Sequence, residues 1–347
     1  MGKTSAAGGD LSCNAPYGCG VVYKLNTAGT ETVLHDLAGH PLDGAYPKTP
    51  VTRDSIGNIY GIAVGGGSYD YGVVFKINTA GNESVLHSFT GGSDGCYPYQ
   101  GLVRDKAGNL YSTTWECGSS DWGTIFKVDS SGHFTILHSF AGYPSDGASP
   151  YLGHLMMDKS GNLYGVTTAG GKSIGCGLTG CGLLYKLSEG GTFTVLHSFA
   201  GRTSDGCYPV GSVVQDKVGN FYRTTNDCGT NSAGTIWKVS KKDKETILHN
   251  FYYGPSDGCW PRAGVARESN GNLYGVTTGC PANKRGALYK LSTTGTLTLL
   301  HSFDYAGSGP IGEVLRTTKG TLFGTTFDGG SGDCSGVGCG TVWSYVP

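Results

Sequence analysis

The sequence predicts an all-β protein built from short repeated units, and three observations support this prediction. The 347 residues include 61 glycines and only 3 methionines, a composition typical of short strands joined by tight turns. A Gly-Asn-aromatic motif recurs at intervals of about 50 residues. A glycine-rich loop and a strand of alternating apolar residues follow each copy, so one structural unit is repeated along the chain.

Each repeat contains four short strands, which we name A to D in chain order. Strand B contains the aromatic residue of the motif, and strand C has the pattern of "GTIFKV" at 123–128. Strand D has the pattern "TVLHSF" (194–199), and an Asp-Gly loop then leads to strand A of the next unit, such as "GLVRD" (101–105). Four strands in about 50 residues predict one blade of a β-propeller. The motif aromatics are Tyr60, Tyr111, Tyr164, Tyr222, Tyr274 and Phe323.

We expect a single β-propeller domain over residues 1–347, with seven four-stranded blades of which the first and last are incomplete. The sequence begins within strand B of the first unit and stops after strand C of the last one. A six-bladed ring with spare terminal strands is the alternative, because unpaired edge strands can pair elsewhere. The approximate repeat units are residues 1–37, 46–89, 97–140, 149–199, 208–251, 260–303 and 310–347.

These motifs resemble the GloVer tandem repeats of bacterial "choice-of-anchor" proteins and, more distantly, NHL-type propellers. The similarity lies in the "GNLYG" stretches, the "GTVFK"-like strand C, the "TVLHSF" strand and the Asp-Gly loop that ends in proline. It covers essentially the whole chain and implies a propeller fold and export from the cell. The resemblance implies no particular activity and no active-site residues, so function has to be sought in the residues themselves.

The twelve cysteines predict six disulfides that follow the repeat. Three pairs each lie within one B–C loop, and three pairs join a D–A loop to the next B–C loop, 21 residues later. In a four-stranded meander these two loops emerge on the same face, so topology brings the second kind of pair together. The first kind is Cys13/Cys19, Cys176/Cys181 and Cys334/Cys339, and the second kind is Cys96/Cys117, Cys207/Cys228 and Cys259/Cys280.

Free thiols and a zinc site are the alternatives to disulfides. The even number of cysteines favours disulfides, as does their matched absence, because a D–A loop without a cysteine is followed by a B–C loop with two or none. A zinc site needs converging ligands, whereas these cysteines are dispersed in twos. Disulfides persist in oxidising compartments, so we expect an extracellular, periplasmic or cell-surface protein. The stretch "MGKTSAAGGD" has no apolar signal region, so we expect any export signal to have been removed or left out.

Charge and motif content argue against several classes of partner. The formal net charge is −1 and 15% of the residues are charged, which favours neither nucleic acid nor an anionic membrane. No apolar run approaches the roughly 20 residues of a membrane span. The sequence has no phosphate-binding loop, dinucleotide fingerprint, zinc-protease helix or nucleophile elbow, and we expect no cofactor and no metal.

Residues that recur once in every unit are expected to be structural. One copy per blade cannot converge on one site, so we expect each strand-D histidine to share a hydrogen-bond network with its serine and with the D–A loop aspartate. The motif tyrosines are expected to pack between blades. The histidines are His35, His87, His138, His197, His249 and His301, and the aspartates are Asp43, Asp94, Asp146, Asp205 and Asp257.

Function is expected where the copies differ on the disulfide-bearing face. Four and five residues beyond the motif aromatic, the repeats diverge and place aromatic or acidic residues in the third, fifth and seventh units. The first of these positions reads Ser5, Val64, Trp115, Thr168, Asn226, Thr278 and Phe327. The second reads Ala6, Gly65, Glu116, Ala169, Asp227, Gly279 and Asp328.

These residues and their loop neighbours form a candidate sugar-type site, in which aromatic faces cover apolar ring surfaces and polar groups fix hydroxyls. Arg223 joins the set because it replaces the usual Gly or Ser of strand B. Ordinary variation of exposed loops is the alternative interpretation. The expected ligand-binding residues are Trp115, Trp122, Asn226, Phe327, Arg223, Tyr97, Trp260 and Arg262, with Asp121 nearby.

The same patch supports a second hypothesis, an extracellular hydrolase or lyase that acts on carbohydrate. Glu116, Asp227 and Asp328 would supply a general acid and base, provided that two of them lie within roughly 5–10 Å. His154 is a weaker catalytic candidate. Its strand A, "PYLGHLMMD" (150–158), is one residue longer than its counterparts, which indicates a bulge.

Three functions are therefore carried forward, and we favour binding over catalysis. The first is an exported propeller that binds a glycan or an extracellular protein through the D–A and B–C loop face. The second is the carbohydrate-active hydrolase or lyase. The third is a self-assembling module, in which incomplete terminal blades join copies or close against a partner.

Overall fold

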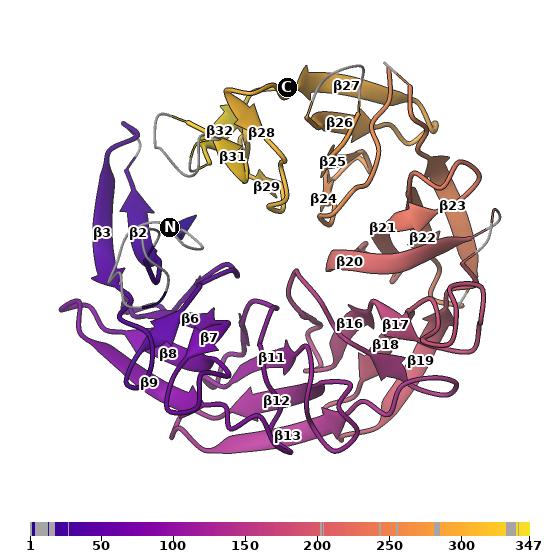
Figure 1. The fold of residues 1–347 in the computed structure, drawn as a ribbon. Helices are drawn as coiled ribbons and strands as arrows, with labels where there is room; N and C mark the ends of the chain where they lie inside the picture. Colours follow the sequence, from indigo (N-terminus) through magenta and orange to yellow (C-terminus); the bar gives the residue numbers. More distant parts are fainter. Residues whose placement is uncertain are drawn as a thin grey trace. The chain divides into compact units, whose positions relative to one another are not determined.

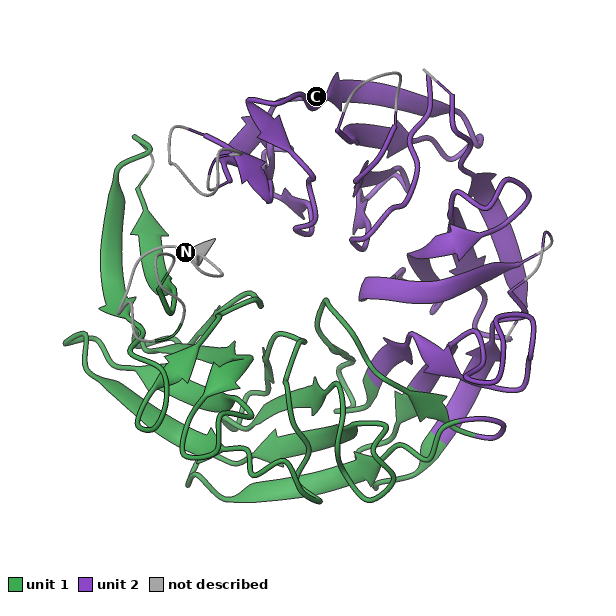
Figure 2. Cartoon of the chain, viewed as in Figure 1, with its two compact units in different colours: residues 1–142, 146–163, 186–193 green, residues 143–145, 164–185, 194–347 purple. Residues whose placement is uncertain are grey.

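The fold is described from a computed structural model. It describes residues 2–3, 13, 18–26, 28–201, 203, 205–242, 244–254, 256–280, 285–330, 338 and 340–347. Within these residues the secondary structure is all-β, and none of them forms a helix that is long and apolar enough to cross a membrane. The chain divides into two compact units (Figure 2), residues 1–142, 146–163 and 186–193 in unit 1 and residues 143–145, 164–185 and 194–347 in unit 2.

Unit 1 contains three antiparallel sheets of three or four strands, and Figure 1 labels most of these strands. The first sheet consists of β1 (Gly2–Lys3), β2 (Val21–Leu25) and β3 (Glu31–Asp36). The second consists of β5 (Thr52–Arg53), β6 (Ile59–Ala63), β8 (Val73–Ile77) and β9 (Glu83–Ser88). The third consists of β10 (Val103–Arg104), β11 (Leu110–Thr114), β12 (Thr124–Val128) and β13 (Phe134–Ser139).

Unit 2 also contains three such sheets. They consist of β20 (Gly206–Gln215), β21 (Phe221–Cys228), β22 (Thr235–Val239) and β23 (Glu245–Asn250); of β24 (Ala266–Arg267), β25 (Leu273–Thr277), β26 (Ala287–Leu291) and β27 (Leu297–Ser302); and of β29 (Leu315–Arg316), β30 (Leu322–Thr325) and β32 (Val342–Tyr345). A further sheet, of β15 (Met156–Met157), β16 (Leu163–Thr167), β18 (Leu183–Leu187) and β19 (Phe193–Ser198), supplies residues to both units.

The all-β, propeller-type fold is confirmed, because each sheet is a meander in the predicted order A, B, C, D. Five sheets have the full four strands, and the first and last sheets have three strands each among the described residues. The structure thus has five complete blades and incomplete terminal sheets, and its blade number is six, not the expected seven. The prediction of seven blades is therefore wrong, and the six-bladed alternative is the one that the structure supports.

Strand B carries a glycine because strand C places a large ring against its backbone. A Cβ on Gly61 would lie 2.3 Å from the ring of Phe75, and a Cβ on Gly275 would lie 2.3 Å from the hydroxyl of Tyr289. Both rings are completely buried. In these two blades the glycine therefore leaves room for the ring of strand C, and it is not a sign of a flexible loop.

The Gly-Asn motif forms the turn between strands A and B. Asp105 accepts hydrogen bonds from the backbone N–H of Asn109 (2.8 Å) and from its side-chain amide (2.7 Å), and the hydroxyl of Tyr111 donates to the same carboxylate at 3.1 Å. The guanidinium of Arg104 lies 5.8 Å from the ring centre of Tyr60 in the preceding blade. This contact confirms that a motif tyrosine packs between blades.

Candidate functional site

The loops between strands D and A and between strands B and C form the face where function was expected. Five predicted disulfides are present, and Cys334 and Cys339 lie outside the described residues. The bridges are Cys13–Cys19, Cys96–Cys117, Cys176–Cys181, Cys207–Cys228 and Cys259–Cys280. The two loops also pair through their backbones, because the N–H of Cys96 donates to the carbonyl of Glu116 at 3.0 Å. The prediction that these loops share a face is confirmed.

Repeats without the longer disulfide join the same loops by a backbone ribbon. In the first complete blade, β4 (Gly44–Ala45) pairs with β7 (Gly65–Gly66). In the last sheet, β28 (Gly307–Ser308) pairs with β31 (Asp328–Gly329) in the same way. The base of the loop face is therefore fixed in both kinds of repeat.

An aromatic group in unit 1 surrounds the predicted Trp115. The ring centre of Trp115 lies 5.4 Å from that of Tyr99 and 5.8 Å from that of Tyr151, and the two tyrosines are 4.9 Å apart. The ammonium of Lys48 lies 5.3 Å from the ring centre of Tyr99. Burial raises the pKa of the Tyr99 phenol, and the neighbouring Tyr151 adds to this rise. We name Lys48, Tyr99, Trp115 and Tyr151 the aromatic group.

Two other predicted residues of unit 1 lie on the same loops. Tyr97 has a positive φ of 53° and packs edge to face on Tyr71, with ring centres 5.5 Å apart. Trp122 is 36% exposed, and its indole nitrogen lies against Gly142. Neither of these ring contacts involves Trp115.

The predicted residues of unit 2 form separate small contacts. The guanidinium of Arg262 donates to the side-chain oxygen of Asn226 at 3.3 Å. Trp260 packs edge to face on Tyr253, with ring centres 5.7 Å apart. Phe327 is 60% exposed.

Arg223 lies in the core and not on the loop face, which corrects the expected placement. Its side chain is 1% exposed, and its Nε–H donates to the carbonyl of Val210 at 2.7 Å. Burial lowers the pKa of Arg223 to about 9, while the nearby carboxylate of Glu313 opposes this shift. The sequence showed that this position was anomalous, but a replacement of glycine does not reveal on which side of the sheet the new side chain lies.

The candidate catalytic carboxylates have local structural partners. Glu116 belongs to unit 1, where its backbone pairs with Cys96. Asp227 accepts a hydrogen bond from the N–H of Cys228 at 2.7 Å, and Asp328 accepts one from the hydroxyl of Ser308 at 3.1 Å. The carboxylates of Asp227 and Asp328 thus anchor their own loops, whereas the contact of Glu116 is made by its backbone.

His154 lies in an irregular strand A. Gly101 forms an isolated parallel bridge with His154. The preceding Leu152 has a positive φ of 54°, and the carbonyl of Gly153 accepts a hydrogen bond from the N–H of Gly101 at 2.7 Å. The extra residue in this segment is thus accommodated by a local distortion of the backbone.

The recurring histidines pair with aspartates as predicted. The Nε2–Oδ2 distances are 3.0 Å for His35–Asp43, 3.1 Å for His87–Asp94, 3.0 Å for His138–Asp146 and 2.9 Å for His249–Asp257. The strand-D serine has a different role from the expected one, since Ser88 and Ser139 accept hydrogen bonds from backbone N–H groups of the B–C loop. The histidine and the aspartate thus hold the D–A loop against strand D, together with backbone hydrogen bonds to the aspartate.

The first residue of the next strand D lies beside four of the histidines, and its identity varies. Phe134 stacks on His87 with ring centres 3.7 Å apart, and Phe193 stacks on His138 at 4.0 Å. In two other repeats this residue is a glutamate, which gives two sets of one histidine and two carboxylates whose ligand atoms all lie within 4.8 Å. The two sets are His35/Asp43/Glu83 and His197/Asp205/Glu245.

Both glutamates are electrostatically perturbed. Burial, reinforced by the charge of Asp43, raises the pKa of Glu83 to about 7. Burial, followed by hydrogen bonding with Asp205, raises the pKa of Glu245 to about 9. Sequence reasoning missed both residues, although the alternation of Glu, Phe and Leu at the first position of strand D was a visible signal.

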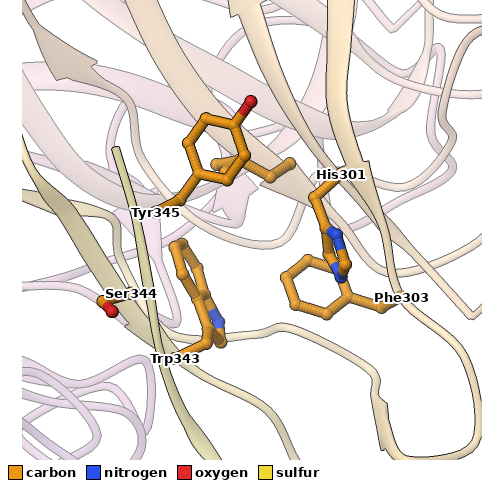
Figure 3. Close-up of a pocket in the computed structure, with 6 residues that line it drawn as sticks. His301, Phe303, Trp343, Ser344 and Tyr345 are labelled. Atoms are coloured by element: carbon orange, nitrogen blue, oxygen red, sulfur yellow. The ribbon is translucent and has the colours of Figure 1, made fainter. Parts of the chain in front are cut away.

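A pocket of about 220 Å³ lies between β27 and β32 in unit 2 (Figure 3). His301 and Phe303 line one side, with ring centres 4.9 Å apart, and Trp343 and Tyr345 line the other. His301 is exposed, whereas its equivalents in the complete blades are covered by the following strand D. The pocket is thus located where the last sheet has no fourth strand among its described residues.

Comparison with known protein families identifies the repeat. The model of the Gloeobacter/Verrucomicrobia repeat matches residues 4–178 and 173–343. The chain belongs to the Gloeobacter/Verrucomicrobia repeat family. This assignment confirms the resemblance seen in the "GNLYG" and "TVLHSF" motifs. No curated protein sequence matches this member of the family.

Several solved structures share the fold of this Gloeobacter/Verrucomicrobia repeat protein. Virginiamycin B lyase from Staphylococcus aureus has a TM-score of 0.55 at 13% identity, covering 87% of this chain and 83% of that chain. A putative 6-phosphogluconolactonase from Bacteroides uniformis has a TM-score of 0.57 at 13% identity, covering 93% and 87%. The periplasmic gluconolactonase of Pseudomonas aeruginosa has a TM-score of 0.55 at 12% identity, covering 100% of both chains. At these identities the similarity shows the fold alone.

Proposed function

We propose that this Gloeobacter/Verrucomicrobia repeat protein is an exported binding protein that recognises a carbohydrate through the aromatic group Lys48, Tyr99, Trp115 and Tyr151. The observation that supports this proposal most is the meeting of three aromatic rings, with centres 4.9–5.8 Å apart, beside a lysine on the loop face. Aromatic faces bind the apolar faces of sugar rings, and a charged group nearby fixes hydroxyls.

The aromatic group is specific to one part of the repeat array. Tyr99 and Tyr151 each follow the proline of a D–A loop, where other repeats have Val210, Arg262 and Ile311. A feature that packing required would recur in every complete blade, as the phenylalanine that follows strand D does. The aromatic residues therefore support a ligand-binding role.

Export is the second part of the proposal, and the disulfides support it. Five bridges within the described residues are maintained only in an oxidising compartment, so the proposed location is extracellular, periplasmic or at the cell surface. Fractionation of the native host, with thiol labelling of each fraction before and after reduction, tests this part. Recovery of the reduced protein in the cytoplasm would reject it.

Binding is tested on the oxidised protein with a glycan array and a polysaccharide pull-down. The variant Trp115→Ala is expected to lose at least tenfold in affinity, because it removes the central ring of the group. Tyr305→Ala is the matched control, since it removes an aromatic side chain that is 74% exposed in unit 2. Equal loss in both variants, or no binding by the wild-type protein, rejects the carbohydrate proposal and leaves an extracellular protein as the ligand to seek.

Catalysis is tested in the same experiment by mass spectrometry of the recovered carbohydrate. Intact carbohydrate is the expected result. Release of fragments would instead support a hydrolase or lyase, and Glu116→Gln and Asp227→Asn would then show whether either carboxylate participates.

A second candidate function, strand binding, is favoured by the pocket at His301. Among the described residues one edge of β32 has no partner strand, and this edge and the apolar lining of the pocket match the position that strand D fills in the complete blades. We propose that an extended segment with the strand-D pattern of alternating apolar residues binds there by β-addition.

The strand proposal is tested with a synthetic peptide of residues 245–251, "ETILHNF", added to the full chain. Saturable quenching or a shift of tryptophan fluorescence is expected, and Trp343→Ala should abolish it. A peptide with Ile247 and Leu248 replaced by serine is the control. Equal binding of both peptides would reject the site, and a solution mass above 36.1 kDa without peptide would indicate that copies of the chain associate instead.

A further inference from the structure

We propose that His197, Asp205 and Glu245 form a binding site for a divalent transition-metal ion, with Zn²⁺ as the preferred cation. The three side chains come from the end of β19, from the D–A loop and from the start of β23, and all belong to unit 2. Their ligand atoms lie within 4.8 Å of one another. An imidazole with two carboxylates is a donor set that Zn²⁺ accepts, whereas Ca²⁺ and Mg²⁺ prefer oxygen ligands alone.

The distances within this set differ from those of an ordinary histidine–aspartate pair. His197 Nε2 lies 3.5 Å from Asp205 Oδ2 and 3.7 Å from Glu245 Oε2. The four equivalent pairs elsewhere have hydrogen-bond distances of 2.9–3.1 Å. Two ligands of a tetrahedral metal with bonds of about 2.0–2.2 Å are about 3.3–3.6 Å apart, so the wider spacing suits a shared ion.

The polar atoms of the set are also incompletely satisfied. Among the described residues, His197 Nε2 and Glu245 Oε1 are buried and have no hydrogen-bond partner. Buried polar atoms without a partner are costly and call for an explanation such as an ion. Asp205 is held in place independently, because it accepts hydrogen bonds from the N–H groups of Ala200 (2.6 Å) and Gly206 (2.7 Å).

Packing does not require a carboxylate at position 245. The equivalent residues Phe134 and Phe193 cover the histidine of the preceding repeat with an apolar ring, and position 297 has a leucine. Glu245 therefore adds two carboxylate oxygens where the repeats with phenylalanine or leucine supply none. The fourth coordination position of a tetrahedral ion would remain for a water molecule or an atom of a ligand.

The set His35/Asp43/Glu83 provides a comparison within the same protein. It has the same three residue types, but His35 and Asp43 keep a hydrogen bond of 3.0 Å. We therefore assign the tight Zn²⁺ site to the set that contains Glu245, and we use Glu83 as the control position.

The test uses the full, oxidised protein after treatment with a chelator and dialysis. Isothermal titration with Zn²⁺ is expected to show one tight site, and Co²⁺ is expected to give the visible absorption of a tetrahedral complex. Glu245→Leu, which introduces the residue found at position 297, is expected to weaken Zn²⁺ binding at least tenfold and to abolish the Zn²⁺-induced rise in Tm. Glu83→Leu is expected to retain both effects.

Two results would overturn the assignment. One is the absence of Zn²⁺ binding by the wild-type protein, and the other is equal Zn²⁺ affinity in Glu245→Leu and wild type. The binding result for Glu245→Leu is interpreted only if the variant folds, so its near-ultraviolet circular dichroism is compared with that of wild type. Glu245→Gln, which keeps the shape and removes the charge, repeats the measurement and is expected to show the same weakened binding.

Discussion

Cys117 and Gly66 occupy the same position in two successive repeats, six residues beyond the motif tyrosine, and both have a positive φ, 61° for the cysteine and 79° for the glycine. Cys117 is bonded to Cys96, whereas Gly66 belongs to the ribbon of β4 and β7. A Cβ on Gly66 would lie 2.3 Å from the carbonyl oxygen of Asp43. The repeat thus has two ways of joining its loops, and the close backbone approach of one excludes the side chain that the other needs.

We predict that the double variant Cys96→Ala/Cys117→Gly folds but is less stable. Opening a 21-residue loop removes about 3 kcal/mol in the chain-entropy account, and relief of the positive φ of Cys117 returns about 1 kcal/mol. A net loss of about 2 kcal/mol in unfolding free energy is expected from urea titration. An unchanged midpoint would show that backbone pairing alone fixes these loops.

We predict that the reverse exchange fails. Ala45→Cys/Gly66→Cys places a side chain against the backbone of Asp43, so the new thiols should stay unbonded and Tm should fall. Mass spectrometry after alkylation under non-reducing conditions counts the free thiols, and Ala45→Cys alone is the control. A new bridge with an equal or higher Tm would contradict the steric argument.

The buried Arg223 is predicted to depend on Glu313 for its stability. Arg223→Met leaves the carboxylate of Glu313 without its opposite charge and is expected to cost about 3 kcal/mol of unfolding free energy. Arg223→Met/Glu313→Gln should recover part of that loss, because neither charge is then left alone. Urea titration of the two single variants and the double variant measures the coupling, and strictly additive losses would argue against it.

We predict that protonation of the Glu268 carboxylate contributes to the loss of thermal stability at acidic pH. Hydrogen bonding from Asn272, with the charge of Arg316, holds the pKa of Glu268 below its ordinary value of about 4.3. A carboxyl whose pKa is lower in the folded state contributes stability above its unfolded pKa, and this contribution is lost as the pH falls through the folded value. The Tm difference between wild type and Glu268→Gln should therefore be largest near neutral pH and should shrink below about pH 4. A constant difference across this range would exclude the linkage.

Much of the fold was predictable because the same contacts within a blade recur in every repeat. The spacing from Tyr111 to strand C and the glycine of "LYG" depend on contacts within one blade, so they are visible in a single stretch of sequence. The pairing of Cys96 with Cys117 follows from the order of the strands. Position along the repeat was therefore sufficient for these features.

The candidate sites were harder to predict because they involve residues of neighbouring repeats. Trp115 was predicted because the repeats differ from one another at its position. Its partners Tyr99 and Tyr151 were not predicted, because they follow the prolines of two different D–A loops. Glu245 belongs to one repeat and His197 to the preceding one, so no motif within a repeat contains both. Arg223 was noticed as an exception, but its burial depends on the packing around strand B.

The D–A and B–C loops are joined at their bases by a disulfide or a backbone ribbon, and this has a practical consequence for protein engineering. Lys48, Tyr99, Trp115 and Tyr151 lie beyond loop segments that are held by a disulfide or by a glycine ribbon, and none of them is part of a blade core. Simultaneous randomisation of these four positions should leave the folding yield nearly unchanged while altering what the surface binds. The repeat array can then serve as a display scaffold, with specificity selected separately from stability.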